Sequence, residues 1–383
     1  MRGLPYLFRL YQSGEASHRV PNPRQGVAGT VPTMERRRLG NSGLLVSEFA
    51  MGAMTFGDEA DEPATHAMLD RFVEAGGTLI DTADVYAKGR SEEYIGRWLA
   101  NRSHDHLVIA TKARFSTSND PNDRGAGRRH ISRAIEASLR RLGVEAIDLY
   151  QIHAWDSQVP VDETLGVLDD LVRLGKVRYL GVSNFTGWQL QRFILTARHL
   201  GSSPIVSLQA QYNLLGRHIE LELLPQLLEE GLGLLPWSPL GGGWLSGKYR
   251  RDDLPTGATR LGEDPARGIE AYGPRNTDRT WQIIDEVAAI GEAHGASPAQ
   301  AALNWVRRRP GVSSVILGAR TVEQLDDNLA ALKWQLTEDE HARLTKVSAP
   351  GLPDYPYGFI ENNAGSDSWA PLGTRATPFP SGY

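Results

Sequence analysis

The chain has no cysteine among its 383 residues, which excludes a disulfide scaffold, a thiolate metal site, an iron–sulfur cluster and a cysteine nucleophile. It also has no surplus of positive charge, since 41 Lys and Arg face 46 Asp and Glu for a net charge of −5. That balance argues against nucleic acid or an anionic membrane as partner. No apolar run approaches the roughly 20 residues that span a bilayer. We therefore expect a soluble, cytoplasmic protein.

The two ends of the chain differ from its middle. Residues 1–33 scatter arginines and prolines without an apolar period, so we predict a disordered N-terminal extension. A transit peptide and a start codon misplaced before Met34 are the alternatives. Residues 34–348 read as one folded domain. Residues 349–383, rich in Gly, Pro, Trp and Tyr, are expected to form an irregular tail over the surface or over the mouth of the domain.

Between these ends, short apolar runs alternate with longer helical patterns. A hairpin is expected over Arg36–Val46, where Gly40-Asn41-Ser42-Gly43 supplies turn chemistry. Eight strand–helix units predict a parallel (β/α)₈ TIM barrel, with an open doubly wound sheet as the alternative. Leu240–Asn276 is too long for an ordinary connection after the seventh strand and is expected to be a functional loop. The predicted strands are Glu48–Gly52, Thr78–Asp81, Leu107–Lys112, Ile147–His153, Val177–Ser183, Ile205–Gln209, Gly233–Trp237 and Ser314–Leu317.

The helices are predicted from period and capping residues. Ser297 before Pro298 and Thr337 before Glu338 are typical helix starts. The predicted helices are Ala64–Glu74, Glu92–Leu99, Arg128–Leu142, Asp162–Arg173, Gly187–Leu200, Glu220–Glu230, Asp278–Ala293, Pro298–Arg307, Val322–Ala330 and Glu338–Val347.

Active sites of such barrels lie at the carboxyl ends of the strands. Strand two ends in Asp81, with Tyr86 in the loop beyond it, strand three ends in Lys112 and strand four in His153. Each alone is typical of a cap, a packed loop or a solvated strand end, but together they form a set for proton transfer. An ammonium beside a tyrosine hydroxyl favours the phenolate, so we expect Lys112 to lower the pKa of Tyr86, Asp81 to hold Lys112, and His153 to orient a carbonyl oxygen.

The set has no obvious nucleophile and no metal cluster, because the carboxylates of 58–62 and the histidines at 104 and 106 lie in polar stretches away from the predicted rim. A phenol that protonates a carbonyl oxygen needs another group to deliver the electron pair. A bound hydride donor is the natural supplement.

The sequence resembles the aldo-keto reductases from Met34 to about Leu332. The resemblance rests on Arg38-Leu39-Gly40-Asn41-Ser42-Gly43-Leu44 and Met51-Gly52-Ala53-Met54-Thr55-Phe56-Gly57, on Ile80-Asp81-Thr82-Ala83-Asp84-Val85-Tyr86 with Ser91-Glu92, and on Thr111-Lys112, Gln151-Ile152-His153 and Gly181-Val182-Ser183-Asn184-Phe185. It implies a barrel closed at the bottom by a hairpin. It also places the family's Asp–Tyr–Lys–His tetrad on Asp81, Tyr86, Lys112 and His153.

The resemblance further implies a site for NADP(H) and names its contacts. Ser183, Asn184 and Gln209 match the residues that hold the nicotinamide amide, and Trp237 matches the aromatic side chain stacked on its ring. Ser238, Pro239, Leu240 and Gly243 match the pyrophosphate loop, with Lys248 as a charge partner. Gly318-Ala319-Arg320, Gln324, Asp327 and Asn328 match the adenosine end. The remaining contacts expected at this site are Gly52, Ala53, Met54 and Asp81.

Arg320 favours NADP over NAD, because a guanidinium forks onto a phosphate and the helix starting near Thr321 adds backbone donors. A solvated loop charge is the alternative for Arg320. The site is not of the Rossmann type, since no Gly-x-Gly-x-x-Gly opens a βαβ unit. The glycines at 241–243 are typical of a flexible loop.

The sequence predicts a reductase that transfers a hydride from NADPH to the carbonyl carbon of an aldehyde or ketone, with sugar-derived carbonyl compounds among the candidate substrates and Tyr86 as general acid. Tyr86, His153 and Trp155 are expected to line the substrate mouth, where Met54 could join them or could simply pack. A cofactor-binding regulatory protein like the potassium-channel β-subunits, which carry asparagine at the position of His153, is one rival. A phosphate-handling barrel isomerase or aldolase is the other. The sequence selects neither a substrate nor an oligomeric state.

Overall fold

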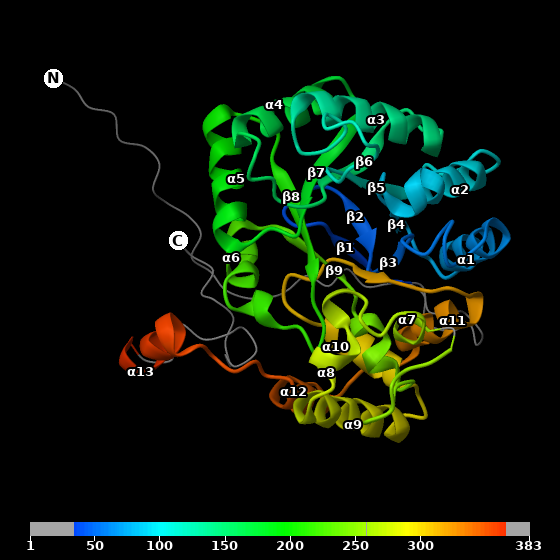
Figure 1. The fold of residues 1–383 in the computed structure, drawn as a ribbon, viewed down its shortest axis with the longest axis vertical. Helices are drawn as coiled ribbons and strands as arrows, with labels where there is room; N and C mark the ends of the chain where they lie inside the picture. The colour runs from blue at the N-terminus through cyan, green and yellow to red at the C-terminus, as the bar shows by residue number, and fades with distance from the viewer. Residues whose placement is uncertain (1–33, 258, 365–383) are drawn as a thin grey trace, which may run out of the picture. The chain divides into compact units, whose positions relative to one another are not determined.

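The computed structural model describes residues 34–257 and 259–364, and eight parallel strands form a barrel at its centre (Figure 1). The strands are β3 (Phe49–Gly52), β4 (Leu79–Asp81), β5 (Val108–Ala113), β6 (Ile147–Ile152), β7 (Val177–Ser183), β8 (Ile205–Gln211), β9 (Gly233–Trp237) and β10 (Val315–Leu317). They pair in the order β10-β3-β4-β5-β6-β7-β8-β9. The barrel closes between Leu234 of β9 and Val312, which precedes β10. The Leu234 N–H donates to the backbone oxygen of Gly311 at 2.8 Å, and the Ser313 N–H donates to the backbone oxygen of Leu234 at 2.9 Å. The predicted barrel is confirmed as nearly closed, and the open doubly wound sheet was wrong.

A two-stranded hairpin plugs the end of the barrel at which the strands begin. β1 (Arg36–Arg38) pairs antiparallel with β2 (Leu45–Ser47). Leu39 and Val46 are fully buried and pack into the inner core of the barrel. The rest of this core consists of small or branched side chains from the barrel strands, among them Ala50 and Leu149. Because this end is filled with apolar side chains, a polar site can open only at the opposite end.

Helices cover the outside of the barrel (Figure 1), with a second, larger core between them and the strands. The helices are α1 (Glu62–Glu74), α2 (Arg90–Leu99), α3 (Arg128–Leu142), α4 (Val161–Arg173), α5 (Gly187–Leu200), α6 (Leu223–Glu230), α9 (Asp278–Ala293), α10 (Pro298–Arg307), α11 (Val322–Ala330) and α12 (Glu338–Val347). The two predicted capping residues, Ser297 and Thr337, precede α10 and α12, and their side chains accept a backbone N–H of the first turn. Asp61 and Thr277 cap α1 and α9 in the same way.

Two segments differ from their predicted form. The helix expected from Glu220 begins at Leu223 instead, after a short turn η2 (His218–Glu220), because the Glu220 carboxylate is buried on Arg217 and Tyr212. The segment 240–276 is not a structureless loop, since Trp244 stacks on Tyr272 at 5.3 Å and gives it a small core of its own. It contains η3 (Gly241–Ser246), α7 (Arg260–Glu263), η4 (Gly268–Glu270) and α8 (Tyr272–Arg275).

The described part of the C-terminal tail contains short turns of helix, η6 (Asp354–Gly358) and α13 (Phe359–Ala364). The expected extension at 1–33 and the remainder of the tail lie outside the described residues, so those expectations stay predictions. Within the described ranges, no helix combines the length and apolar character needed to cross a membrane. The remaining short elements are η1 (Tyr86–Gly89) and η5 (Ala331–Lys333).

Candidate active site

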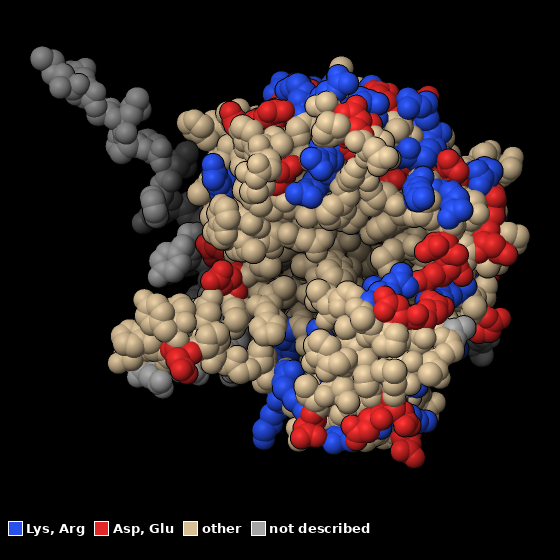
Figure 2. All heavy atoms as spheres, in the orientation of Figure 1, with Lys and Arg blue, Asp and Glu red and all other residues tan. Residues whose placement is uncertain are grey.

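A cavity of about 640 Å³ opens at the carboxyl ends of the barrel strands, and Figure 2 shows a hollow on this face. Side chains from nearly every strand end reach it, because parallel strands present their carboxyl ends at one rim. Its lining includes Gly52, Ala53, Met54, Asp81, Tyr86, His153, Asn184, Gln209, Trp237, Ser238, Pro239, Leu240, Gly243, Lys248, Gly318, Ala319, Arg320, Gln324, Asp327 and Asn328.

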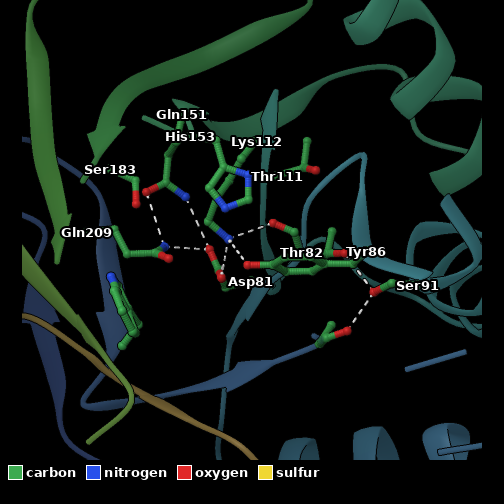
Figure 3. Close-up of polar contacts among 12 residues, drawn as sticks. Asp81, Thr82, Tyr86, Ser91, Thr111, Lys112, Gln151, His153, Ser183 and Gln209 are labelled. Atoms are coloured by element: carbon green, nitrogen blue, oxygen red, sulfur yellow. Dashed lines mark hydrogen bonds and ion pairs between the residues drawn. The ribbon is translucent and has the colours of Figure 1, made fainter. Parts of the chain in front are cut away.

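Lys112 lies at the centre of the polar contacts beneath this cavity (Figure 3). Its Nζ donates to Asp81 Oδ2 at 2.6 Å, to the backbone oxygen of Thr82 at 2.8 Å and to the Tyr86 hydroxyl at 3.3 Å. The ammonium is fully buried, so these three acceptors replace its water shell. The structure thus brings Asp81, Tyr86 and Lys112 into one chain of contacts, with the Tyr86 hydroxyl at its outer end.

Two glutamine amides hold the other side of the Asp81 carboxylate. Gln151 and Gln209 donate from Nε2 to Asp81 Oδ1 at 3.1 and 2.8 Å, and Gln209 also donates to Gln151 Oε1 at 3.3 Å (Figure 3). Sequence reasoning assigned no role to Gln151, although it faces Lys112 in the register of β5 and β6. With both oxygens bonded, the carboxylate is fixed in direction, and it fixes Lys112 in turn.

The net pKa of Tyr86 differs from the expected one. Burial raises the pKa of its hydroxyl above the usual value, and the Lys112 ammonium opposes this rise without reversing it. Lys112 thus acts on this pKa in the expected direction, but the net shift is upward because burial of the phenolate costs more than one neighbouring charge returns. For Lys112, burial acts to lower the pKa, but Asp81 and Tyr86 outweigh it and raise the pKa. At neutral pH the pair is therefore a protonated phenol beside an ammonium.

His153 follows β6 directly and closes the site from the side. Its ring packs against Phe115 at 4.6 Å and meets Tyr86 edge-on at 5.7 Å between ring centroids. Burial, helped by Lys112 and Arg114, lowers the pKa of this imidazole to about 2, so it is neutral at pH 7. Among the described residues, none hydrogen-bonds to the buried Nδ1. The neutral ring lines the cavity, where one of its nitrogens can donate an N–H.

A second buried carboxyl, that of Asp84, lies within the loop that leads from β4 to Tyr86. Asp84 is 3% exposed, and neither of its oxygens has a hydrogen-bond partner among the described residues. Burial, and then repulsion from the Glu92 carboxylate, raises the pKa of Asp84 to about 8, although Arg141 opposes the shift. Glu92 itself is bonded to Thr111 at 2.6 Å and to Arg141 at 2.7 Å. The Tyr86 loop therefore contains a carboxyl that is neutral in the folded protein at pH 7.

Asn184 and Trp237 adjoin this catalytic group across the cavity. Trp237 Nε1 donates to Asn184 Oδ1 at 3.1 Å, and Asn184 Nδ2 donates to Ser183 Oγ at 3.0 Å and to the backbone oxygen of His153 at 2.9 Å. Asn184 adopts a left-handed backbone with φ of 55°, which Asn tolerates better than most residues. The contacts couple the rim of β6 to those of β7 and β9.

The glycine loop after β9 is a shaped surface, not the flexible loop that the sequence indicated. Gly242 and Gly243 have φ of 66° and 96°. A Cβ on Gly243 would lie 2.4 Å from Lys248 Cε, and one on Gly242 would lie 2.4 Å from a Glu270 oxygen. Ser238 is tied to Glu270 and accepts from the Gly242 N–H at 3.1 Å. Bare backbone therefore faces the cavity next to the Lys248 ammonium, as binding of a pyrophosphate requires.

Arg320 lies at the far end of the cavity and is held by two acids. Its Nε meets Glu59 Oε2 at 2.6 Å, and its terminal nitrogens fork onto the two Glu263 oxygens at 2.8 and 3.1 Å. Glu59 also pairs with Arg267 at 2.9 Å. The long segment after β9 is thereby tied to the loops after β3 and β10.

Comparison with known proteins gives this arrangement a family. The model of the Aldo/keto reductase family matches residues 48–349. The chain belongs to the aldo/keto reductase family. It is 35% identical over 343 residues to the protein called tas of Escherichia coli, covering 82% of this chain and 97% of that one. This makes it an aldo/keto reductase family oxidoreductase.

Two further relatives differ in their stated roles. One is a probable voltage-gated potassium channel subunit beta of Oryza sativa, 36% identical over 309 residues, which cover 78% of this chain and 91% of that protein. Another is the versiconal hemiacetal acetate reductase of Aspergillus parasiticus, 31% identical over 347 residues, covering 83% and 98%. The role predicted from the sequence, reductase, and one of its two rivals, channel subunit, thus both occur among the relatives.

Some of the site residues assigned from the sequence lie beside the cavity and not on it. Lys112 and Ser183 stand behind the lining, while Trp155 packs against Phe185 and Trp188 at 5.3 and 5.4 Å. Asp327 lines the cavity, but its carboxylate is bonded to Ser297 and Gln300 of the neighbouring helix. The lining residues that sequence reasoning missed include Glu59, Val85, Phe115, Gly242, Ser246, Thr259, Arg260 and Ala299.

Proposed function

We propose that this protein is an NADP(H)-dependent carbonyl reductase in which Tyr86 protonates the oxygen of an aldehyde or ketone. The observation that carries the proposal is the contact chain from Asp81 through the buried Lys112 ammonium to the Tyr86 hydroxyl at the cavity. The raised pKa of Tyr86 keeps its proton in place at neutral pH. A general acid must hold its proton until the substrate oxygen takes it.

The donor set along the cavity fits a dinucleotide. Trp237 offers a ring face, Gly242 and Gly243 offer bare backbone beside Lys248, and Arg320 offers a guanidinium at the far end. Asn184 lies between Trp237 and His153 and presents an amide to a carboxamide. When bound, the reduced nicotinamide would supply the hydride that the side chains of this site cannot.

The side chains supply the remaining parts of the reaction. The neutral His153 donates a ring N–H to the carbonyl oxygen and orients it toward the Tyr86 hydroxyl. As charge grows on that oxygen, Tyr86 gives up its proton, and the ammonium of Lys112 stabilises the phenolate that remains. Asp81 keeps Lys112 in position throughout. Phe115 and Met54, 36% and 43% exposed, offer apolar surface beside the reacting carbon.

The direct test is Tyr86→Phe, assayed with NADPH over a panel of aldehydes and ketones. We expect kcat/KM to fall by about 10²–10⁴, the usual contribution of general acid catalysis. NADPH binding, followed by quenching of tryptophan fluorescence, should be unchanged. Tyr94→Phe on α2 removes a hydroxyl away from the cavity and serves as the control. Intact activity in Tyr86→Phe would contradict the assignment.

The same titration separates the alternatives. A cofactor-binding regulatory protein, favoured by the potassium-channel relatives, would bind NADPH but reduce no carbonyl compound in the panel. A phosphate-handling isomerase or aldolase would not bind the nicotinamide cofactor at all. The substrate panel would then give the chemical class that the sequence does not select.

A further inference from the structure

The two acids on Arg320 occupy different sides of its guanidinium. Glu59 contacts Nε, while Glu263 takes both terminal nitrogens in a fork. A phosphate bound by arginine uses that same pair of parallel N–H groups. Glu263 therefore holds the hydrogen-bonding edge that a phosphate of the cofactor would need.

The two acids also differ in how firmly they are held. The Glu59 side chain is 15% exposed and also pairs with Arg267. The backbone N–H of Glu59 donates to the backbone oxygen of Thr55 at 2.9 Å, which fixes the turn that carries it. Glu263 is 44% exposed and lies on the four-residue helix α7. Arg320 lowers the pKa of Glu263, which is therefore ionised at neutral pH. Glu263 is the partner that can leave, and Glu59 is the one that stays and orients the guanidinium.

The cations around this point favour an anionic ligand. Burial, then Arg320 and Arg260, lower the pKa of Lys248, so these three cations lie within electrostatic reach of one another on the cavity wall. Glu263 and Glu59 offset part of that positive charge. A ligand phosphate would do the same from inside the cavity.

We propose that Glu263 is a specificity-determining residue of the cofactor site, whose carboxylate competes with the 2′-phosphate of NADP(H) for the terminal nitrogens of Arg320. This inference rests on the proposed function, and it adds Glu263 as a residue that weakens the binding of NADP(H). NADPH must displace Glu263 from Arg320, whereas NADH, which has a 2′-hydroxyl, leaves the pair intact. The preference for NADPH is thus lower than Arg320 alone would give, and α7 is released from the loop after β10 when NADPH binds.

The experiment compares dissociation constants for NADPH, NADH and adenosine 2′,5′-bisphosphate in wild type, Glu263→Gln and Asp264→Asn. Binding is measured without a carbonyl substrate, by fluorescence for the two coenzymes and by calorimetry for the bisphosphate. Glu263→Gln should bind NADPH and the bisphosphate about two- to fivefold more tightly, the range for an exposed ion pair, with NADH unchanged. The gain should shrink at high ionic strength. Asp264→Asn removes the same charge one residue away and should change none of the constants.

Three results would overturn the inference. Weaker or unchanged NADPH binding in Glu263→Gln would mean that the carboxylate does not compete. Equal tightening of NADPH and NADH would mean that Glu263 only holds the loop closed. An equal tightening of NADPH binding in Asp264→Asn would mean that any negative charge in this segment weakens binding, without competition for Arg320. If wild-type protein bound neither coenzyme, the proposed function itself would fall, and this inference with it.

Discussion

The two ends of the cavity are built from different material. At the proposed catalytic end, Asp81 and Lys112 lie on neighbouring strands, are 3% and 0% exposed, and are hydrogen-bonded to the buried Thr82, Gln151 and Gln209. At the far end, Arg320 and Glu263 lie on connecting segments, and the Glu263 side chain is 44% exposed. Buried ion pairs are costly to break, whereas exposed ones contribute little. The proposed function therefore combines a proton-transfer group fixed by buried contacts with an anion site at which, as proposed, an exposed acid gives way to a phosphate.

Lys112→Met gives the largest expected effect, because it leaves the Asp81 carboxylate buried without its cation. We expect a loss of about 3–5 kcal/mol in the free energy of unfolding, together with loss of carbonyl reduction. Denaturant titration and steady-state rates measure the two effects. The double variant Asp81→Asn with Lys112→Met should recover most of the stability and none of the activity. A double variant as unstable as the single one would show that packing, and not the unpaired charge, sets the cost.

Asp84→Asn tests whether the buried carboxyl in the loop before Tyr86 makes stability depend on pH. The folded pKa of Asp84 is raised from 3.8 to about 8, so its contribution to stability is complete below pH 4 and is lost as the pH rises to about 8. The variant should lack this loss, and the fall in unfolding free energy between pH 4 and pH 9 should be smaller by a few kcal/mol. Histidines contribute equally to both proteins. Parallel pH profiles would show that Asp84 is ionised in the folded state.

Gly243→Ala tests the shaped loop between the two ends. The substitution places a side chain at φ of 96° and within 2.4 Å of Lys248 Cε. Such strain costs roughly 1–2 kcal/mol, and we expect NADPH and NADH to bind about tenfold more weakly, both alike, because they share the pyrophosphate. The control is Gly273→Ala in the same segment, where no atom lies within 4 Å of the added Cβ. A loss confined to one coenzyme would contradict a pyrophosphate site here.

Arg320→Met should have the smallest and most selective effect. In the proposed site the 2′-phosphate of NADPH binds this guanidinium, so NADPH binding should weaken by up to about tenfold while NADH binding stays near that of wild type. The salt dependence of NADPH binding should also become shallower. Arg251→Met, which removes an exposed arginine paired with Asp278, is the control. Equal losses for both coenzymes would place the 2′-phosphate elsewhere.

Three of the four proposed catalytic residues, Asp81, Lys112 and His153, were accessible to sequence reasoning because each of them ends an apolar run, whereas Tyr86 lies in the loop beyond the second run. Parallel pairing then aligns those ends, as when Asp81 faces Gly52 across β3 and β4 and Lys112 faces Gln151 across β5 and β6. The role of Gln151 was missed although it stands within the segment that carries His153. Its side chain gains a function only when Gln209, distant in the chain, donates to the same Asp81 oxygen.

The sequence by itself determined that strands alternate with helices around a parallel sheet, because alternating apolar runs and capped helices allow few other ways to bury their faces. It also determined which side chains end the strands. Closure of that sheet into a barrel was decided by the tertiary structure, at the bridge between Leu234 and Val312. Only the tertiary structure decided the direction of the Tyr86 pKa shift, since burial depends on everything packed around the hydroxyl. It alone joined Glu59 and Glu263 to Arg320, because no spacing or period relates residues on three separate loops.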